Sequence, residues 1–237
     1  MPHVQFEPRR ALRAAKILAA DPDDLPQVFT LIESLSGTTL DRVTARLRRS
    51  APGARLLRDR PDIVARLADR AALARLPEGT LGRAYLDFVE REGISADGIR
   101  AADAKGMAHP TALPPDLAYT NARMRDTHDL WHAAVGYHGD VLGEVALLAF
   151  TLAQTGNPAV ALMVAIGLAK TLGAPAARGV IYDGFRRGRA AAWLPEQEWE
   201  SLLALPLDEV RARLSLESSP VYTPVRSHEL KARRAAA

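Results

Sequence analysis

The stretch His128-Asp-Leu-Trp-His132 organises this chain, and after eleven residues it is followed by Glu144 and the apolar run 145–150. His128 and His132 are four residues apart, so on a helix their Cβ atoms lie about 5–6 Å apart and both imidazoles can reach one metal ion. Glu144 opens an apolar segment that predicts a second helix packed against the first, where a carboxylate favours a cation beside it. The intervening loop contains three glycines that allow the chain to reverse direction: Gly136, Gly139 and Gly143.

Paired histidines at this spacing, with a distal acid, are typical of zinc enzymes. Asp129 stands where the HExxH metalloproteases have their glutamate base, although aspartate is one methylene shorter. Two interpretations therefore stay open on the residues alone. One is a metal site, which would include a metal-dependent hydrolase with Asp129 or Glu144 as the base. The other is a helix face whose histidines are capped or hydrogen-bonded, beside a solvated Glu144 at a helix N-terminus.

The complete pattern resembles that of a known family. HDxxH-x11-E, which reads here as His128, Asp129, His132 and Glu144, is similar to the signature of the COQ-four family of ubiquinone (coenzyme Q) biosynthesis proteins. The resemblance spans about residues 75–215. The segments that carry it besides the motif are 76–88, Tyr119 with 123–127, 184–189, Trp199 with Glu200, and Leu207 with Val210, Arg211 and Leu214.

The resemblance implies a function in coenzyme Q assembly. The family is implicated in oxidative decarboxylation of the polyprenyl-hydroxybenzoate ring, in which hydroxyl replaces the C1 carboxyl, and in organising the other biosynthetic proteins. Because zinc cannot change its redox state, the oxidising equivalent would come from molecular oxygen or another partner. Two alternatives remain open: a non-enzymatic isoprenoid-lipid-binding scaffold with a structural metal, and the metal-dependent hydrolase.

The resemblance also implies a set of site residues. A divalent ion, zinc by preference and otherwise magnesium, iron or manganese, is expected to be bound at the catalytic site by His128, Asp129, His132 and Glu144. Neighbouring residues on a helix point about 100° apart, so one of His128 and Asp129 would orient the other instead of binding the ion. Four further residues are candidates to contact the substrate head group: Tyr119, Arg123, His138 and Asp140.

The composition predicts an all-α protein. Of the 237 residues, 48% are hydrophobic and only 5% aromatic, and good helix formers dominate. There is no cysteine, so a metal ion must use nitrogen and oxygen ligands. The net charge of +3 equals that of the last residues alone, where four basic side chains outnumber Glu229, and this argues against a nucleic-acid partner. The basic side chains are Arg226, Lys231, Arg233 and Arg234.

We expect a single-domain helical bundle at 1–217, with the metal-site segment at 116–172 and a basic, disordered tail at 218–237. The helix with the paired histidines is expected to run from near Asp116 to Val135. The apolar blocks 145–153 and 159–169 are each shorter than the about 20 residues that cross a bilayer, so both should be buried helices. They form plain core, or they also wall an apolar cleft for an isoprenoid tail. The glycine- and proline-rich segment 93–117 is a candidate gate.

The expected partners follow from this scheme. They are a polyprenylated hydroxybenzoate or another isoprenoid lipid, other ubiquinone biosynthesis proteins and a membrane surface, and a homodimer is a possible assembly. The amphipathic helix at 8–19 and the basic tail are the segments suited to a membrane surface. No secretory signal is visible. The expected location is therefore cytoplasmic and peripheral to the inner membrane, on the matrix side in a eukaryote.

Overall fold

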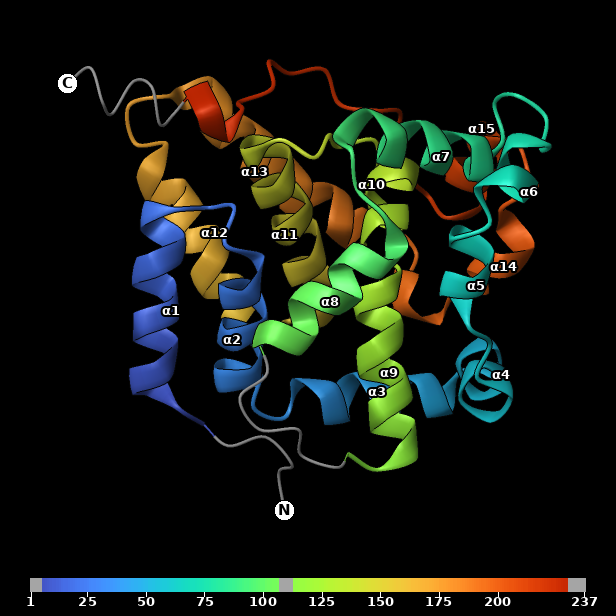
Figure 1. Ribbon diagram of the computed structural model, residues 1–237, viewed down its shortest axis with the longest axis horizontal. Coiled ribbons are helices and arrows are strands. Elements are labelled where there is room, and N and C mark those ends of the chain that lie inside the picture. The colour runs from blue at the N-terminus through green and yellow to red at the C-terminus, as the bar shows by residue number, and fades with distance from the viewer. Residues whose placement is uncertain (1–5, 107–112, 230–237) are drawn as a thin grey trace.

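Helices make up nearly all of the regular structure in this protein (Figure 1). The computed structural model describes residues 6–106 and 113–229, and in these residues there is no β-strand, only an isolated bridge between Thr80 and Pro206. The predicted all-α class is confirmed. The elements are α1 Pro8–Ala20, α2 Leu25–Leu35, α3 Thr39–Arg49, α4 Ala51–Asp59, α5 Ile63–Leu67, α6 Arg70–Ala74, α7 Leu81–Glu92, α8 Ala96–Gly106, α9 Pro115–Asp126, α10 His128–Val135, α11 Val141–Thr155, α12 Pro158–Lys170, α13 Pro175–Ala190, the 3-10 turn η1 Leu194–Glu196, α14 Trp199–Leu202 and α15 Leu207–Arg213.

Side-chain caps set the starts of several helices. Asp140 caps α11 by accepting hydrogen bonds from the amides of Leu142 and Gly143, and Asn157 caps α12 in the same way. Ser50 caps α4, which has a proline in its first turn. A proline is tolerated in the first turn of a helix because its missing N–H would have no intrahelical partner there anyway.

The helix expected from Asp116 to Val135 is two helices in the structure. α9 ends at Asp126 and α10 begins at His128, with Thr127 between them. The Thr127 hydroxyl donates a hydrogen bond to the carbonyl oxygen of Arg123 at 2.8 Å, a back-bond of the kind that bends helices. The paired histidines therefore occupy a short helix of their own.

α11 lies at the centre of the bundle and makes its most extensive contacts with α13 and α12 (Figure 1). Two glycines on α13 permit the close approach to α11. A Cβ atom on Gly184 would lie 2.2 Å from the carbonyl oxygen of Ala146, and one on Gly188 would lie 2.5 Å from that of Phe150. The glycine pair in 184–189 thus has a packing role: it lets α13 hold α11 in place.

Two hydrophobic cores meet at α11. The first, here called the aromatic core, contains Tyr85, Phe88, Trp131, Phe150 and Trp199 with aliphatic neighbours from α5, α7, α10 and α15. The second, here called the alanine-rich core, joins α1, α2, α11, α12 and α13 and has no buried aromatic side chain. Its buried members are Ala11, Ala14, Ala15, Leu31, Leu142, Ala149, Ala159, Val160, Met163, Val164 and Ile181.

Residues 218–229, predicted from the sequence to belong to a disordered tail, instead run across the surface of the bundle and contact it. Tyr222 and Val225 bond to Asp140, and Arg226 pairs with Glu92 at 2.6 Å. The buried carboxylates of Asp140 and Glu92 hold this segment against the bundle, because hydrogen bonds to a charged acceptor are strong. Residues 230–237 lie outside the described part of the chain. None of the described helices has both the length and the apolar character to span a membrane.

Candidate metal centre

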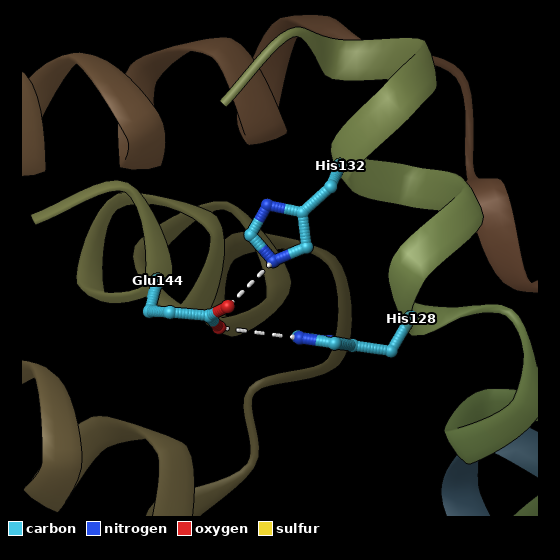
Figure 2. Close-up of side chains that lie close together, drawn as sticks. All are labelled: His128, His132 and Glu144. Carbon is cyan, nitrogen blue, oxygen red and sulfur yellow. Dashed lines mark hydrogen bonds and ion pairs between the residues drawn. The ribbon is translucent and has the colours of Figure 1, made fainter. Parts of the chain in front are cut away.

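Two helices bring three of the four expected ligands together (Figure 2). His128 and His132 project from successive turns of α10, and Glu144 projects toward them from the first turn of α11. The two carboxylate oxygens of Glu144 lie 3.3 Å from Nε2 of His128 and 3.2 Å from Nε2 of His132. One ligand atom from each residue falls within 4.8 Å of the other two. The two histidines, four residues apart, and the glutamate that follows after eleven residues thus point toward one another.

His132 is held in the orientation that a metal ligand needs. Its ring is 1% exposed, stacks on Phe88 at 5.0 Å between centroids, and places Nδ1 3.1 Å from the carbonyl oxygen of Tyr137. A carbonyl only accepts, so Nδ1 carries a hydrogen, and in the neutral imidazole the lone pair of Nε2 faces Glu144. Buried Nε2 has no hydrogen bond of good geometry despite its short distance to Oε1. An orphaned nitrogen lone pair beside a carboxylate is a natural site for a cation.

The electrostatics of the three groups are strongly coupled. Partial burial would raise the pKa of Glu144, but His132 and His128 lower it far below its usual range, so the side chain is a carboxylate. Burial by itself would lower the pKa of His128, and the hydrogen bond and charge of Glu144 raise it overall. The group therefore pairs negative charge with positive charge, and a divalent cation would supply the same compensation.

The donor set fits a divalent metal ion. Two ligands about 2.0–2.1 Å from a tetrahedral ion lie about 3.3 Å apart, close to the distance from each imidazole nitrogen to its own carboxylate oxygen, and one ligand atom from each residue falls within 4.8 Å of the others. Two imidazole nitrogens and one carboxylate oxygen leave a fourth position for water or substrate, as in catalytic zinc sites. Magnesium fits less well because it prefers oxygen ligands and retains several waters.

Asp129 does not join the three ligands. It follows His128 on α10, about 100° around the helix, and its carboxylate is not among the ligand atoms that lie within 4.8 Å of one another. Its side chain lines the adjacent cavity, and burial raises its pKa above the usual range of an aspartate. Asp129 therefore lies beside the centre, and of the two neighbours His128 is the one placed to bind the ion.

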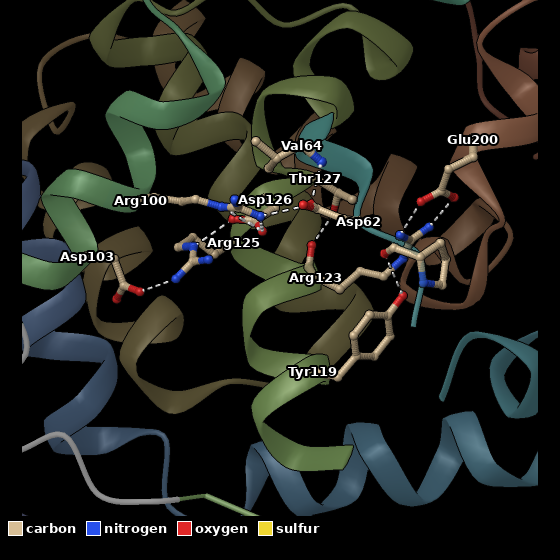
Figure 3. A network of polar contacts seen from close by, with 11 residues as sticks. Asp62, Val64, Arg100, Asp103, Tyr119, Arg123, Arg125, Asp126, Thr127 and Glu200 are labelled. Atoms are coloured by element: carbon tan, nitrogen blue, oxygen red, sulfur yellow. Dashed lines mark hydrogen bonds and ion pairs between the residues drawn. The ribbon is translucent and has the colours of Figure 1, made fainter. Parts of the chain in front are cut away.

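The four residues expected at the substrate head group lie in two different places. Arg123 is buried and forms a bidentate pair with Glu200 at 2.7 and 2.8 Å, with Tyr119 beside it (Figure 3). Neither residue lines the cavity next to the triad. His138 and Asp140 lie in the loop before α11, close to Glu144. Asp140 lines the cavity, although four donors already occupy its carboxylate.

A large cavity of about 1330 Å³ adjoins the candidate centre. His128, Asp129 and Glu144 line one part of it. The rest of its wall is mainly apolar and comes largely from α1, α2, α11 and α12, with further residues from α3, α8, α9, α13 and 225–227. Its apolar lining includes Leu18, Val28, Ile32, Leu142, Leu148, Val160, Met163 and Ile166. The cavity adjoins the alanine-rich core, and no buried residue of the aromatic core lines it.

A polar network joins α8 to α9 (Figure 3). Arg125 pairs with Asp103 at 2.5 Å and with Asp126 at 2.7 Å, and Arg100 pairs with Asp126 at 2.7 Å. Asp103 and Arg125 both line the cavity. Thus α8, part of the segment expected to gate the site, is tied to α9 in this structure; residues 107–112 lie outside the described part.

Sequence reasoning missed the groups that support the triad. Phe88 belongs to the segment 76–88 that resembles the family, but nothing in its spacing predicts that it stacks on His132. The Tyr137 carbonyl is a backbone group, so no residue type could have signalled it. Tyr222 is separated from Asp140 by more than eighty positions, and only the fold brings them together.

Comparisons with known proteins agree with one another. The family model described as "Coenzyme Q (ubiquinone) biosynthesis protein Coq4" matches residues 9–220. The mitochondrial ubiquinone biosynthesis protein COQ4 homolog of Danio rerio is 34% identical over 205 residues, which cover 82% of this chain and 70% of the relative. Its counterpart from Bos taurus is 31% identical over 217 residues, covering 89% and 78%. A crystal structure of a candidate ubiquinone biosynthesis protein from Nostoc punctiforme superposes with a TM-score of 0.66 at 25% identity, covering 90% of this chain and all of that one.

Proposed function

The chain belongs to the Coq4 family of coenzyme Q (ubiquinone) biosynthesis proteins, and we propose that within this pathway it catalyses a metal-dependent oxidative decarboxylation. The substrate is a polyprenyl-hydroxybenzoate whose C1 carboxyl is replaced by hydroxyl. The observation that carries the proposal is the convergence of His128, His132 and Glu144 beside a large, mainly apolar cavity. The alternative is that the metal at this centre is structural and catalyses no reaction. The protein would then be a lipid-binding scaffold for the other biosynthetic proteins.

The three side chains hold a divalent ion, for which zinc is the first choice on the donor set. When bound, the ion supplies Lewis-acid stabilisation of the negative charge that develops on the substrate as carbon dioxide leaves. Replacing carboxyl by hydroxyl, with water or oxygen as the source of the new oxygen atom, is a two-electron oxidation. Molecular oxygen or a partner protein must therefore accept the electrons, since zinc does not.

The cavity accounts for the lipid part of the substrate. Its volume of about 1330 Å³ exceeds the roughly 300–1,000 Å³ of pockets that hold small ligands. His128, Asp129 and Glu144 in its wall face a head group, while leucines, valines and Met163 face a prenyl tail. Burying that tail stabilises the complex in proportion to the apolar area removed from water, and it fixes the ring beside the three ligands.

We further propose that α1 places the protein on a membrane surface. The buried face of α1 is made of alanines, whereas Leu12 and Ile17 are 57% and 41% exposed. Basic side chains share the exposed face: Arg9, Arg13 and Lys16. A helix that presents apolar and cationic groups together is suited to an anionic lipid interface. Leu18 near the end of α1 and Leu25 at the start of α2 line the cavity, so a lipid would have a short path from the membrane surface to it.

The experiment that tests the function uses the purified protein with its metal content measured. Wild type should release carbon dioxide and form the hydroxylated ring from a prenylated hydroxybenzoate in the presence of oxygen. His132→Ala should abolish the product and the bound metal, while His228→Ala, which changes a histidine outside the triad, should leave both intact. Product from metal-free His132→Ala would overturn the metal assignment. Binding of the substrate without product in wild type would favour the scaffold, and hydrolysis products would favour the hydrolase.

A further inference from the structure

One buried carboxylate connects the triad to a segment far along the chain. Asp140 is 1% exposed, and its Oδ1 accepts hydrogen bonds from the amides of Leu142 and Gly143 in the first turn of α11. The same Oδ1 accepts from the amide of Val225 at 2.7 Å, and Oδ2 accepts from the hydroxyl of Tyr222 at 2.7 Å. Asp140 therefore holds the start of α11 and residues 222–225 with one side chain.

Residues 219–226, here called the strap, fit the loop before α11 closely. Besides the bonds to Asp140, the amide of Val141 donates to the carbonyl oxygen of Val225 at 3.0 Å, and the amide of His138 donates to the hydroxyl of Tyr222 at 3.0 Å. Arg226 closes the far end by pairing with buried Glu92 on α7. Each of these polar groups would cost free energy if it were buried without a hydrogen bond.

Two glycines of the loop leave the space that the strap occupies. A Cβ atom on Gly143 would lie 2.4 Å from the Tyr222 hydroxyl and 2.2 Å from the His138 carbonyl oxygen. A Cβ atom on Gly136 would lie 2.4 Å from Oγ of Ser219. Only Gly136 has a positive φ, of +93°, so only it needs glycine in order to reverse the chain. Gly143 needs glycine because any side chain there would meet both the His138 carbonyl of the loop and the Tyr222 hydroxyl of the strap.

The loop beneath the strap supports both kinds of ligand in the triad. Glu144 donates its amide to the carbonyl oxygen of Asp140 at 2.8 Å, so the position of Asp140 sets the first turn from which Glu144 projects. The carbonyl oxygen of Tyr137, one residue before the strap's contact at His138, accepts from Nδ1 of His132. Groups that orient metal ligands in this way contribute to metal affinity without touching the ion.

We propose that the strap is a positioning element of the metal centre, with Asp140 and Tyr222 as the positioning residues, and that docking of the strap and occupation of the centre favour each other. This inference rests on the proposed function, since it requires that the triad binds a metal. Coupling between two sites is reciprocal: a docked strap raises metal affinity, and bound metal stabilises the docked strap by the same factor. Residues 221–226 lie beyond the stretch that the family model matches, so the family assignment does not contain this role.

The test removes one hydroxyl from the strap. In Tyr222→Phe the zinc affinity, measured by competition with a chromogenic chelator, should fall about tenfold, the lower end of the range for groups that orient ligands. The visible absorption of the cobalt-substituted protein should change as well, because the geometry at the ion relaxes. Tyr182→Phe is the matched control: its ring is 56% exposed on α13, and both readouts should equal those of wild type.

The reciprocal arm measures amide hydrogen exchange of residues 219–226 in the full chain with and without zinc. Zinc should slow exchange there in wild type, and the slowing should shrink in Tyr222→Phe. If Tyr222→Phe proves unstable, Asp140→Asn replaces it, because asparagine still caps α11 but its amide cannot accept from Tyr222. Wild-type zinc affinity and exchange in a folded variant would overturn the strap inference alone. Absence of zinc binding in wild type would overturn the metal centre and the strap inference together.

Discussion

The two cores on either side of α11 are packed in opposite ways. The aromatic core is filled by large rings, with Tyr85, Phe88, Trp131 and Trp199 each at most 2% exposed. The alanine-rich core has short side chains at its buried helix contacts and adjoins the cavity of about 1330 Å³. The triad lies on the boundary, with His132 stacked on a ring of the first core and Glu144 open to the cavity of the second. Dense packing thus fixes the ligands, and sparse packing provides room for what they act on.

The largest effect should come from the aromatic core. Trp131→Ala should lower the free energy of unfolding by about 3–5 kcal/mol, because the ring is 2% exposed, packs on Phe150 and leaves a large hole. Met163→Ala is the comparison in the other core, where a cavity already adjoins the side chain, and it should cost about 2 kcal/mol. Urea unfolding of both variants measures the difference. Equal costs would break the contrast between the two cores.

The next effect concerns the helix contact that joins the cores. Gly184→Ala should cost about 1–3 kcal/mol, since the new Cβ would meet the Ala146 carbonyl oxygen, a backbone atom that cannot rotate away. Gly179→Ala on the same helix is the control, because nothing lies within 4 Å of its Cβ position and alanine favours helix by roughly 0.5–1 kcal/mol. Thermal unfolding should shift in opposite directions for the two variants. A stabilised Gly184→Ala protein would contradict the close approach of α13 to α11.

A smaller effect on stability should accompany a large effect on ligand binding in the cavity. Leu148→Trp adds bulk where the side chain lines open space, so we expect a stability change within about 1 kcal/mol and loss of prenyl-lipid binding. Leu147→Trp, its neighbour, points into the aromatic core at 0% exposure and should cost about 1–3 kcal/mol or more. Lipid binding is measured with a fluorescent prenyl analogue. Unchanged binding in a folded Leu148→Trp protein would mean that the cavity does not hold the tail.

The smallest expected effect is a pH dependence of stability at the ion pair between Arg226 of the strap and Glu92 of α7. Burial opposes ionisation of Glu92, but Arg226 lowers its pKa below the usual 4.5. A carboxyl whose folded pKa is depressed contributes stability that is fully present above its unfolded pKa and is lost as pH falls through the folded value. The stability of wild type should therefore decline below about pH 4.5 more steeply than that of Glu92→Gln. Urea unfolding at several pH values measures the free energy of unfolding of both proteins. If it declines equally in the two, this ion pair does not contribute to the pH dependence.

Local patterns in the sequence predicted most elements well. The helices α1, α11 and α12 were recognisable from apolar spacing, because this signal acts within one or two turns. The failures share a cause. The division at Thr127 depends on whether a threonine hydroxyl bonds to the turn before it, and the order of residues 218–229 depends on acceptors far away in the chain.

The candidate site divides in the same manner. Spacing alone put His128 and His132 on one face and Glu144 at the start of the next helix, because helical geometry is local and regular. Spacing could not exclude Asp129 from the ligands, since that depends on the crossing of α10 and α11. Nor could it show that Arg123 is committed to Glu200, a partner from α14.

The amino-acid order by itself determined the helical class, the family and four candidate metal ligands, all of which follow from short-range periodicity and a short motif; the structure brings three of the four together. Only the tertiary structure decided where the cavity lies, which groups orient His132 and Glu144, and that residues 219–226 close over the start of α11. The physical reason is that burial, stacking and long-range hydrogen bonds depend on which surfaces meet. That is a property of the whole packed chain, whereas helix periodicity is a property of neighbouring residues.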